Sequence, residues 1–200
     1  MTNDYSAVAK LHITGINQGF LSSLGEDFLA LLYQAIDESE NSTLIVHRLN
    51  GDIVGFVAGA QGLGEIYKII LKHWWKLFVS LLPSLFSLKK IERILETVFY
   101  EKKSAKFEFV IPDSELLSIV VKDEYRGQGI AGQLLNELAE YFRSRDIDQF
   151  KIIVGESLMP AHQFYLKMGA VSVGEIMLHG DNISIVYVYD CGFKREITNL

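Results

Sequence analysis

The stretch Leu116–Leu138, LLSIVVKDEYRGQGIAGQLLNEL, decides how the chain is interpreted. Its first residues form an apolar run typical of a buried strand. A polar turn with two glycines, Gly127 and Gly129, comes next, and an amphipathic helical pattern begins at Ala131. Small residues let a backbone approach a phosphate, and the N–H groups of a first helical turn point at it. The stretch therefore predicts an anion site between a strand and a helix.

This turn differs from two common phosphate-binding loops. No Gly-Lys-Ser/Thr follows it, as a P-loop requires, and the dinucleotide spacing G-x-G-x-x-G is absent. Arg126 adds a fixed positive charge at its mouth. The order Arg-x-x-Gly-x-Ala over Arg126–Ala131, after an apolar strand and before a Leu-rich helix, resembles the acetyl-CoA motif of the GNAT acetyltransferase superfamily.

A second segment, Ala161–Ala170 (AHQFYLKMGA), is similar to the Ala-x-x-Phe-Tyr-x-Lys-x-Gly-Phe segment of the same superfamily. There the helix lies beside the pantetheine arm, and its tyrosine protonates the departing thiolate. The resemblance makes Tyr165 the candidate general acid, since a phenol with a pKa near 10 can donate a proton without being ionised beforehand. Leu158 replaces an Asn that is frequent in the family, so the expected polar cofactor contact is either missing or moved to Ser157.

The resemblance also implies where the rest of the site lies. In the family a bulge splays the strand before the turn from its neighbour, and the match puts that role on Ile119–Val121. The general base varies within the family; Glu115 is our first candidate, ahead of Glu156 and His162. The residues assigned to the cofactor are Ile119, Val120, Val121, Arg126, Gly127, Gln128, Gly129, Ile130, Ala131, Ser157, Phe164 and Tyr165.

Composition is consistent with one compact enzyme domain over residues 1–200. The 200 residues are 49% hydrophobic, which is enough for a sizeable core. The net charge of -6 argues against a nucleic-acid binder that acts through bulk charge. Cys191 is the single cysteine, so neither an internal disulfide nor a cysteine metal site is expected. The first ten residues do not resemble a signal peptide, which favours a cytoplasmic setting.

The remaining pattern predicts a mixed α/β chain. One expected helix follows Gly25, a second covers Ala131–Arg145 and a third covers Met159–Lys167. Asn50-Gly51 is a tight hairpin signal. The expected strands are Ala7–Ile13, Ser42–Leu49, Ile53–Ala60, Phe107–Ile111, Leu116–Val121, Phe150–Val154, Val171–Leu178 and Ile183–Tyr189. The helix between the strands of the cofactor motif makes those two strands parallel.

Residues 65–100 form an unusual insert. Apolar residues recur at helical spacing, and Lys68, Lys72 and Lys76 lie on one helix face. The insert is net positive in a net negative chain. The uncharged run within the insert is too short to span a membrane. A helical flap over the acceptor site, a dimer contact and a membrane-surface element remain as interpretations, with Trp74 and Trp75 as candidates for lining an acceptor pocket.

The sequence thus predicts a GNAT-like fold, a central mixed twisted sheet of about seven strands flanked by helices, with a helical insert. The resemblance implies an N-acetyltransferase that uses acetyl-CoA as co-substrate and acetylates a primary amine. A small molecule or an amino sugar is the preferred acceptor. The alternatives are a protein or peptide N-acetyltransferase and a non-catalytic domain that binds acyl-CoA. Metal and nucleic acid are not expected.

Overall fold

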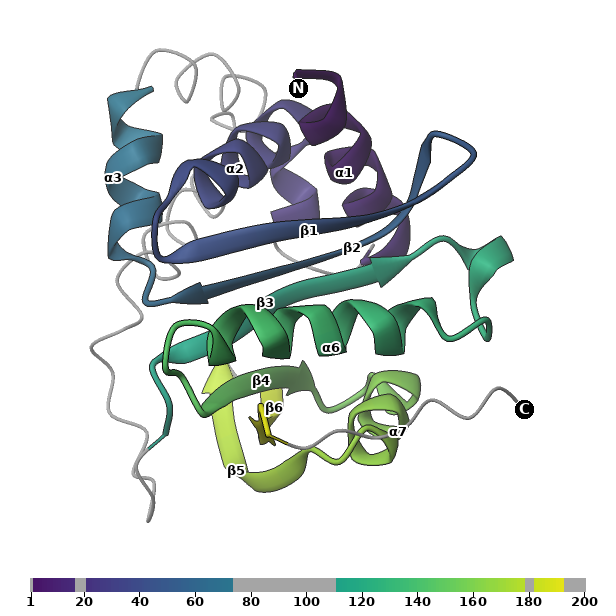
Figure 1. Ribbon diagram of the computed structural model, residues 1–200, viewed down its shortest axis with the longest axis vertical. Helices are drawn as coiled ribbons and strands as arrows, with labels where there is room; N and C mark the ends of the chain where they lie inside the picture. The colour runs from purple at the N-terminus through teal and green to yellow at the C-terminus, as the bar shows by residue number, and fades with distance from the viewer. Residues whose placement is uncertain (1, 17–20, 74–110, 179–181, 193–200) are drawn as a thin grey trace.

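The computed structural model describes residues 2–16, 21–73, 111–178 and 182–192 (Figure 1). Its strands form one six-stranded sheet in the order β1-β2-β3-β4-β6-β5. Neighbouring strands are antiparallel except β3 and β4, which are parallel as expected. The strands are β1 (Ser42–Leu49), β2 (Asp52–Gln61), β3 (Ser114–Val121), β4 (Gln149–Gly155), β5 (Val171–Leu178) and β6 (Asn182–Asp190).

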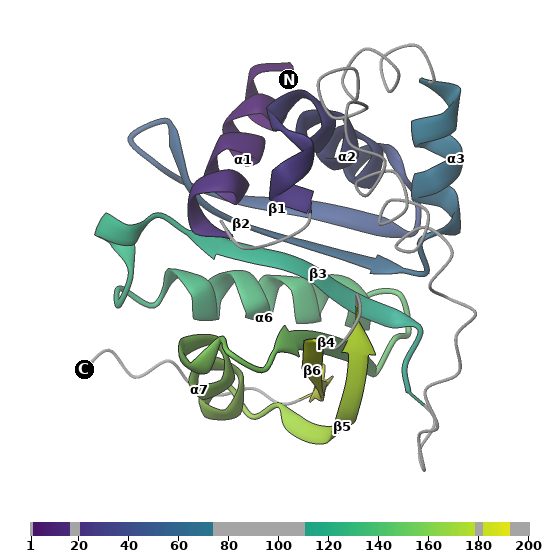
Figure 2. The ribbon, with the colours of Figure 1, turned by 180° about the vertical axis from the view of Figure 1, so that it is seen from behind.

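Helices cover both faces of this sheet. They are α1 (Thr2–Gly15), α2 (Glu26–Glu38), α3 (Gly64–Lys72), α6 (Ile130–Arg143) and α7 (Met159–Lys167), with short 3-10 turns at Leu21–Leu24 and Asp123–Tyr125. Figures 1 and 2 show α1, α2 and α3 on one side and α6 on the other. The side chains separate into two cores accordingly, one shared by α6 and α7 and one by α1, α2 and α3. The mixed α/β prediction is confirmed.

The prediction of a first strand at Ala7–Ile13 is wrong, because this segment lies within helix α1. The short run alternates enough to suggest a strand. Its buried residues Val8, Leu11 and His12 nevertheless follow helical spacing, and Ala, Leu and Lys are good helix formers. The described chain therefore has six strands where about seven were expected. The strand expected at Phe107–Ile111 falls almost entirely outside the described residues.

The hairpin prediction is confirmed. Leu49 pairs with Asp52, which leaves Asn50 and Gly51 as a two-residue turn. Their φ angles of 52° and 90° are the left-handed values that such a turn needs. The return strand β2 is buried along nearly its whole length because helices cover it on both faces.

A β-bulge interrupts β3. Opposite β2, Ala58 pairs with Ser118 and Gly59 with Leu116, so Leu117 is an extra residue. The side chain of Leu116 packs in the α6 core, whereas Leu117 contacts the core of α1 and α2. Ser118 faces that second core as well, since Tyr33 of α2 bonds to it. Two successive side chains thus share one face, which an unbroken strand does not allow.

Only the start of the insert is described. Helix α3 buries Ile66 and Ile70 in the core of α1 and α2, and its Lys68 pairs with Glu65 at 2.6 Å. Residues 74–110, which include Trp74 and Trp75, lie outside the described residues. None of the helices within the described ranges is long and apolar enough to cross a membrane.

We predict that Gly59→Ala destabilises the chain. A Cβ there would lie 2.5 Å from Leu138 Cδ1, 3.1 Å from Phe142 Cζ and 3.2 Å from the Glu115 carbonyl. Forcing a methyl group into such a site costs about 1–3 kcal/mol, which urea unfolding measures. Gly64→Ala is the control, because its Cβ meets nothing within 4 Å and alanine favours the helix. Equal stability of the two variants would contradict the packing of α6 on β2.

Candidate active site

The glycine-rich turn after β3 adopts backbone angles that favour glycine. Gly127 has a φ of 77° and Gly129, the N-cap of α6, a φ of 81°. Side chains with a Cβ avoid this region. Residues 126–129 are exposed, whereas Ile130 is buried and anchors the first turn of α6 in the core. The turn is therefore held rigidly at its helical end and open to a ligand at its tip.

The N-terminus of α6 presents free donors. The first backbone N–H of the helix that has an acceptor is that of Gln133, which bonds to the Gly129 carbonyl at 3.0 Å. No described residue accepts from the N–H groups of Ile130, Ala131 or Gly132, and no side chain caps the helix. These N–H groups carry the positive end of the helix dipole, so they suit an anion.

Arg126 lies at the mouth of this turn as expected. Its Nε donates to the Val121 carbonyl at 3.3 Å, and a terminal nitrogen pairs with Asp123 at 2.8 Å. Both partners of that ion pair are largely exposed, so it contributes little to stability. The contacts orient the guanidinium and leave it accessible to a phosphate.

Strands β3 and β4 part midway. They pair only at Glu115 with Lys151 and at Leu116 with Ile152, although β3 continues along β2 to Val121. The parting begins at the bulge residue Leu117. The expectation of a bulge within residues 119–121 is therefore wrong by at least two positions, because the extra residue sits where pairing with β4 ends. Residues 119–121 lie in the segment that has left β4.

The parting opens toward the glycine-rich turn. Because β3 and β4 are parallel, their carboxyl ends share one edge of the sheet. Val121 at the end of β3 leads to the turn at 126–129, and Gly155 at the end of β4 leads to the exposed Ser157. Glu115 lies at the opposite, paired end of β3. The candidate phosphate site thus follows the open end of β3, whereas the candidate base lies at the end of β3 that is paired with β4.

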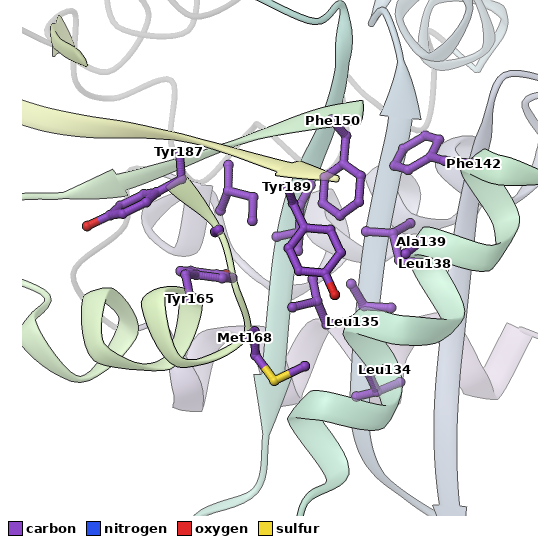
Figure 3. Packing of buried hydrophobic residues seen from close by; sticks show 14 of the residues in the cluster. Leu134, Leu135, Leu138, Ala139, Phe142, Phe150, Tyr165, Met168, Tyr187 and Tyr189 are labelled. Atoms are coloured by element: carbon purple, nitrogen blue, oxygen red, sulfur yellow. The ribbon is translucent and has the colours of Figure 1, made fainter. Parts of the chain in front are cut away.

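Tyr165 extends from α7 into the core between α6 and β6 (Figure 3). It is buried, its ring lies 5.1 Å from that of Phe164 and 6.4 Å from that of Tyr187, and its hydroxyl bonds to no other described residue. Burial raises the pKa of Tyr165 well above the usual value for a phenol. The side chain therefore stays protonated and can act as a proton donor.

The three candidate bases differ in their surroundings. Glu115 is partly buried and pairs with Lys151, whose Nζ is 3.5 Å from its carboxylate and also donates to the Pro112 carbonyl. Glu156 is exposed on the turn after β4. His162 is buried with both ring nitrogens engaged by protein groups, so it offers no free nitrogen to a substrate. The geometry keeps Glu115 as the first candidate.

Sequence reasoning missed a buried polar chain on the other face of the sheet. Nδ1 of His12 lies 2.5 Å from the Tyr33 hydroxyl, which lies 2.9 Å from the Ser118 hydroxyl. Nε2 of His12 is buried and has no hydrogen-bond partner among the residues that the structure describes. The three residues come from α1, α2 and β3 and are far apart in sequence, so no local pattern could have revealed the chain. It ends next to the bulge.

A family model places this geometry among known enzymes. The model described as the acetyltransferase (GNAT) family matches residues 13–170. The chain belongs to the GNAT family of acetyltransferases. The matched range includes α2, the bulged strand, the glycine-rich turn and α7, so it covers the elements on which the resemblance rested.

Solved GNAT structures share the fold. The ribosomal-protein-S18-alanine N-acetyltransferase from Escherichia coli is 14% identical, with a TM-score of 0.57 over 100% of this chain and 96% of that one. An aminoglycoside 6'-N-acetyltransferase complexed with coenzyme A is 12% identical (TM-score 0.58, 96% and 93%). Ard1 from Thermoplasma volcanium is 14% identical (TM-score 0.58, 95% and 93%). No curated protein sequence matches the chain.

We predict that His12 makes this GNAT chain sensitive to mild acid. Burial lowers the pKa of His12 to about 4, from 6.5 for an unperturbed side chain. The unfolded chain therefore binds the proton more readily, so stability is complete above about pH 6.5 and falls as the pH drops toward 4. Between pH 7 and 5 the loss is about 2 kcal/mol.

Urea unfolding at several pH values tests this, with His12→Gln as the matched variant. Glutamine does not titrate, so the free energy of unfolding should fall less steeply with acid in the variant than in the wild type. Parallel curves for the two proteins would show that the imidazole is not the group responsible.

Proposed function

We propose that the chain is an acetyl-CoA-dependent N-acetyltransferase that moves an acetyl group to a primary amine by direct attack. One observation carries the proposal: β3 leaves β4 at Leu117 and then leads into a helix N-terminus with free N–H groups. This arrangement offers backbone donors and acceptors along an extended path that ends at an anion site.

The residues present fit acetyl-CoA. The N–H groups of Ile130, Ala131 and Gly132, with Arg126, suit the pyrophosphate. The backbone of residues 119–121, which has no partner on β4, suits the pantetheine amides. Leu158, the departure from the family pattern, is 45% exposed and lies near Gly155 at the end of β4. An apolar contact with the pantetheine arm replaces the expected polar one there.

The chemistry divides among three groups. Glu115 takes the proton of the substrate ammonium, so that the neutral amine forms the new N–C bond. Backbone N–H groups near Val120 and Val121 stabilise the tetrahedral oxyanion. As the C–S bond breaks, Tyr165 donates its proton to the thiolate, and the remaining extra proton of the attacking nitrogen returns, directly or through solvent, to the tyrosinate, which leaves a neutral amide. Leu116 faces the α6 core, so Glu115 points to the opposite face, whereas Tyr165 lies on the α6 side.

A small amine or an amino sugar is the proposed acceptor, and a cytoplasmic enzyme is the proposed setting. A protein or peptide amine and a domain that binds acyl-CoA without turnover are the alternatives that the experiments below separate. Among the structural neighbours, one is named for an aminoglycoside and one for a ribosomal protein, so the fold itself serves both kinds of acceptor.

We predict that acetyl-CoA and CoA bind with micromolar affinity in calorimetric titration, and that Gly129→Val abolishes this binding. Valine would strain the left-handed N-cap and cover the donors of α6. Gly62→Val is the matched control, because Gly62 has a similar φ of 71° and lies beyond β2 at the far end of β3. Wild-type affinity in the Gly129 variant would refute the assigned phosphate site.

We predict that Tyr165→Phe keeps acetyl-CoA binding but lowers kcat by about 100-fold, a typical effect of losing a general acid. Turnover is measured as CoA thiol release with a panel of aminoglycosides, amino sugars and peptide amines. Unchanged kcat would assign the proton to another group. Binding without turnover on any amine would support the non-catalytic alternative.

A further inference from the structure

His162 occupies an unusual position at the junction of three elements. It lies on α7, one turn before Tyr165, and it is buried. Its Nε2 is 3.1 Å from the Gly155 carbonyl and 3.2 Å from the Glu156 carbonyl, at the end of β4. Its Nδ1 is 2.8 Å from the hydroxyl of Tyr187 on β6. One side chain thus connects α7 to both neighbouring strands.

These partners determine the hydrogen positions. A carbonyl oxygen can only accept, so Nε2 of His162 must carry a hydrogen. In the neutral ring Nδ1 is then an acceptor, and the Tyr187 hydroxyl donates to it. Both polar atoms of the imidazole and the proton of Tyr187 are therefore committed to bonds within the protein.

The hydrogen bond from Tyr187 to His162 distinguishes Tyr187 from the neighbouring Tyr165. Their rings pack 6.4 Å apart in the same core (Figure 3). The hydroxyl of Tyr187 is occupied by His162, whereas the hydroxyl of Tyr165 bonds to no other described residue. Of the two, only Tyr165 has a proton left for a ligand.

We propose that His162 is a positioning residue that, together with Tyr187, holds the Tyr165 hydroxyl against the sulfur of coenzyme A. The two carbonyl bonds fix the start of α7 to β4, and the Tyr187 bond fixes the ring against which Tyr165 packs. This inference rests on the proposed function, because it needs a thiol beside Tyr165.

Coenzyme A itself is the probe, so no acceptor is required. A hydroxyl that donates to the thiolate lowers the pKa of the bound CoA thiol, which ultraviolet absorbance of the thiolate reports across a pH titration. The dissociation constant for CoA at neutral pH and the melting temperature are measured alongside. A merely structural histidine would change the melting temperature and leave the thiol pKa alone.

The variants are Tyr165→Phe, His162→Phe, His162→Gln and Tyr187→Phe, with Tyr189→Phe as the matched control on the same strand. We expect the first variant to raise the bound thiol pKa by about one unit. His162→Phe and Tyr187→Phe should raise it in the same direction with less than about a threefold change in CoA affinity. His162→Gln, which keeps an N–H for the carbonyls, should recover part of the shift, and Tyr189→Phe should show none.

The outcomes separate this inference from the proposed function. If the wild type does not bind CoA, the proposed function is overturned. If Tyr165→Phe shifts the thiol pKa and the His162 and Tyr187 variants do not, only the positioning role is overturned. Should His162→Phe fail to fold, the thiol pKa measured with Tyr187→Phe alone tests the positioning role. That variant removes a single oxygen atom, so we expect it to fold.

Discussion

The extra residue at Leu117 is the constraint on which the site depends. β3 keeps its ladder with β2 to Val121 but leaves β4 after Leu116. A buried backbone group without a partner costs about 1–3 kcal/mol, so the loss of most of the β3–β4 ladder is a substantial cost for a central strand. A bound chain with its own amides would replace the missing pairs. The bulge therefore lowers the stability of the sheet, but it leaves an opening between β3 and β4 that leads to the N-terminus of α6.

The same residue also joins the two halves of the molecule. Because the bulge shifts the alternation of side chains, Ser118 faces α1 and α2 and bonds to Tyr33, which bonds to His12. Buried hydrogen bonds of this kind contribute about 1 kcal/mol each when both partners are satisfied. The N-terminal helices are thus tied to the strand at the point where it opens, and a shift of either would alter the other.

The parts of the site that sequence predicts well are those with a local cause. The helix Met159–Lys167 and the strand Val171–Leu178 have the expected bounds, and the glycine-rich turn has the φ angles its glycines suggest. The strand predicted at Ala7–Ile13 is part of helix α1, because a short apolar run fits the period of a strand as well as that of a helix. The position of the bulge and the bonds of His12 depend on residues from other elements, so no window of sequence contains them.

The cofactor side and the acceptor side of the site therefore have different origins. The glycine-rich turn, the open edge of β3 and helix α7 each lie within one continuous stretch of the sequence. A sequence motif can therefore describe each of them. The face opposite α6 is assembled from α1, α2 and the strand residues that the bulge turns toward them. In the proposed reaction, an amine that reaches Glu115 meets that assembled face, so we expect acceptor specificity to depend on packing between distant segments rather than on the motif. Members of one family can then share the cofactor chemistry and differ in what they acetylate.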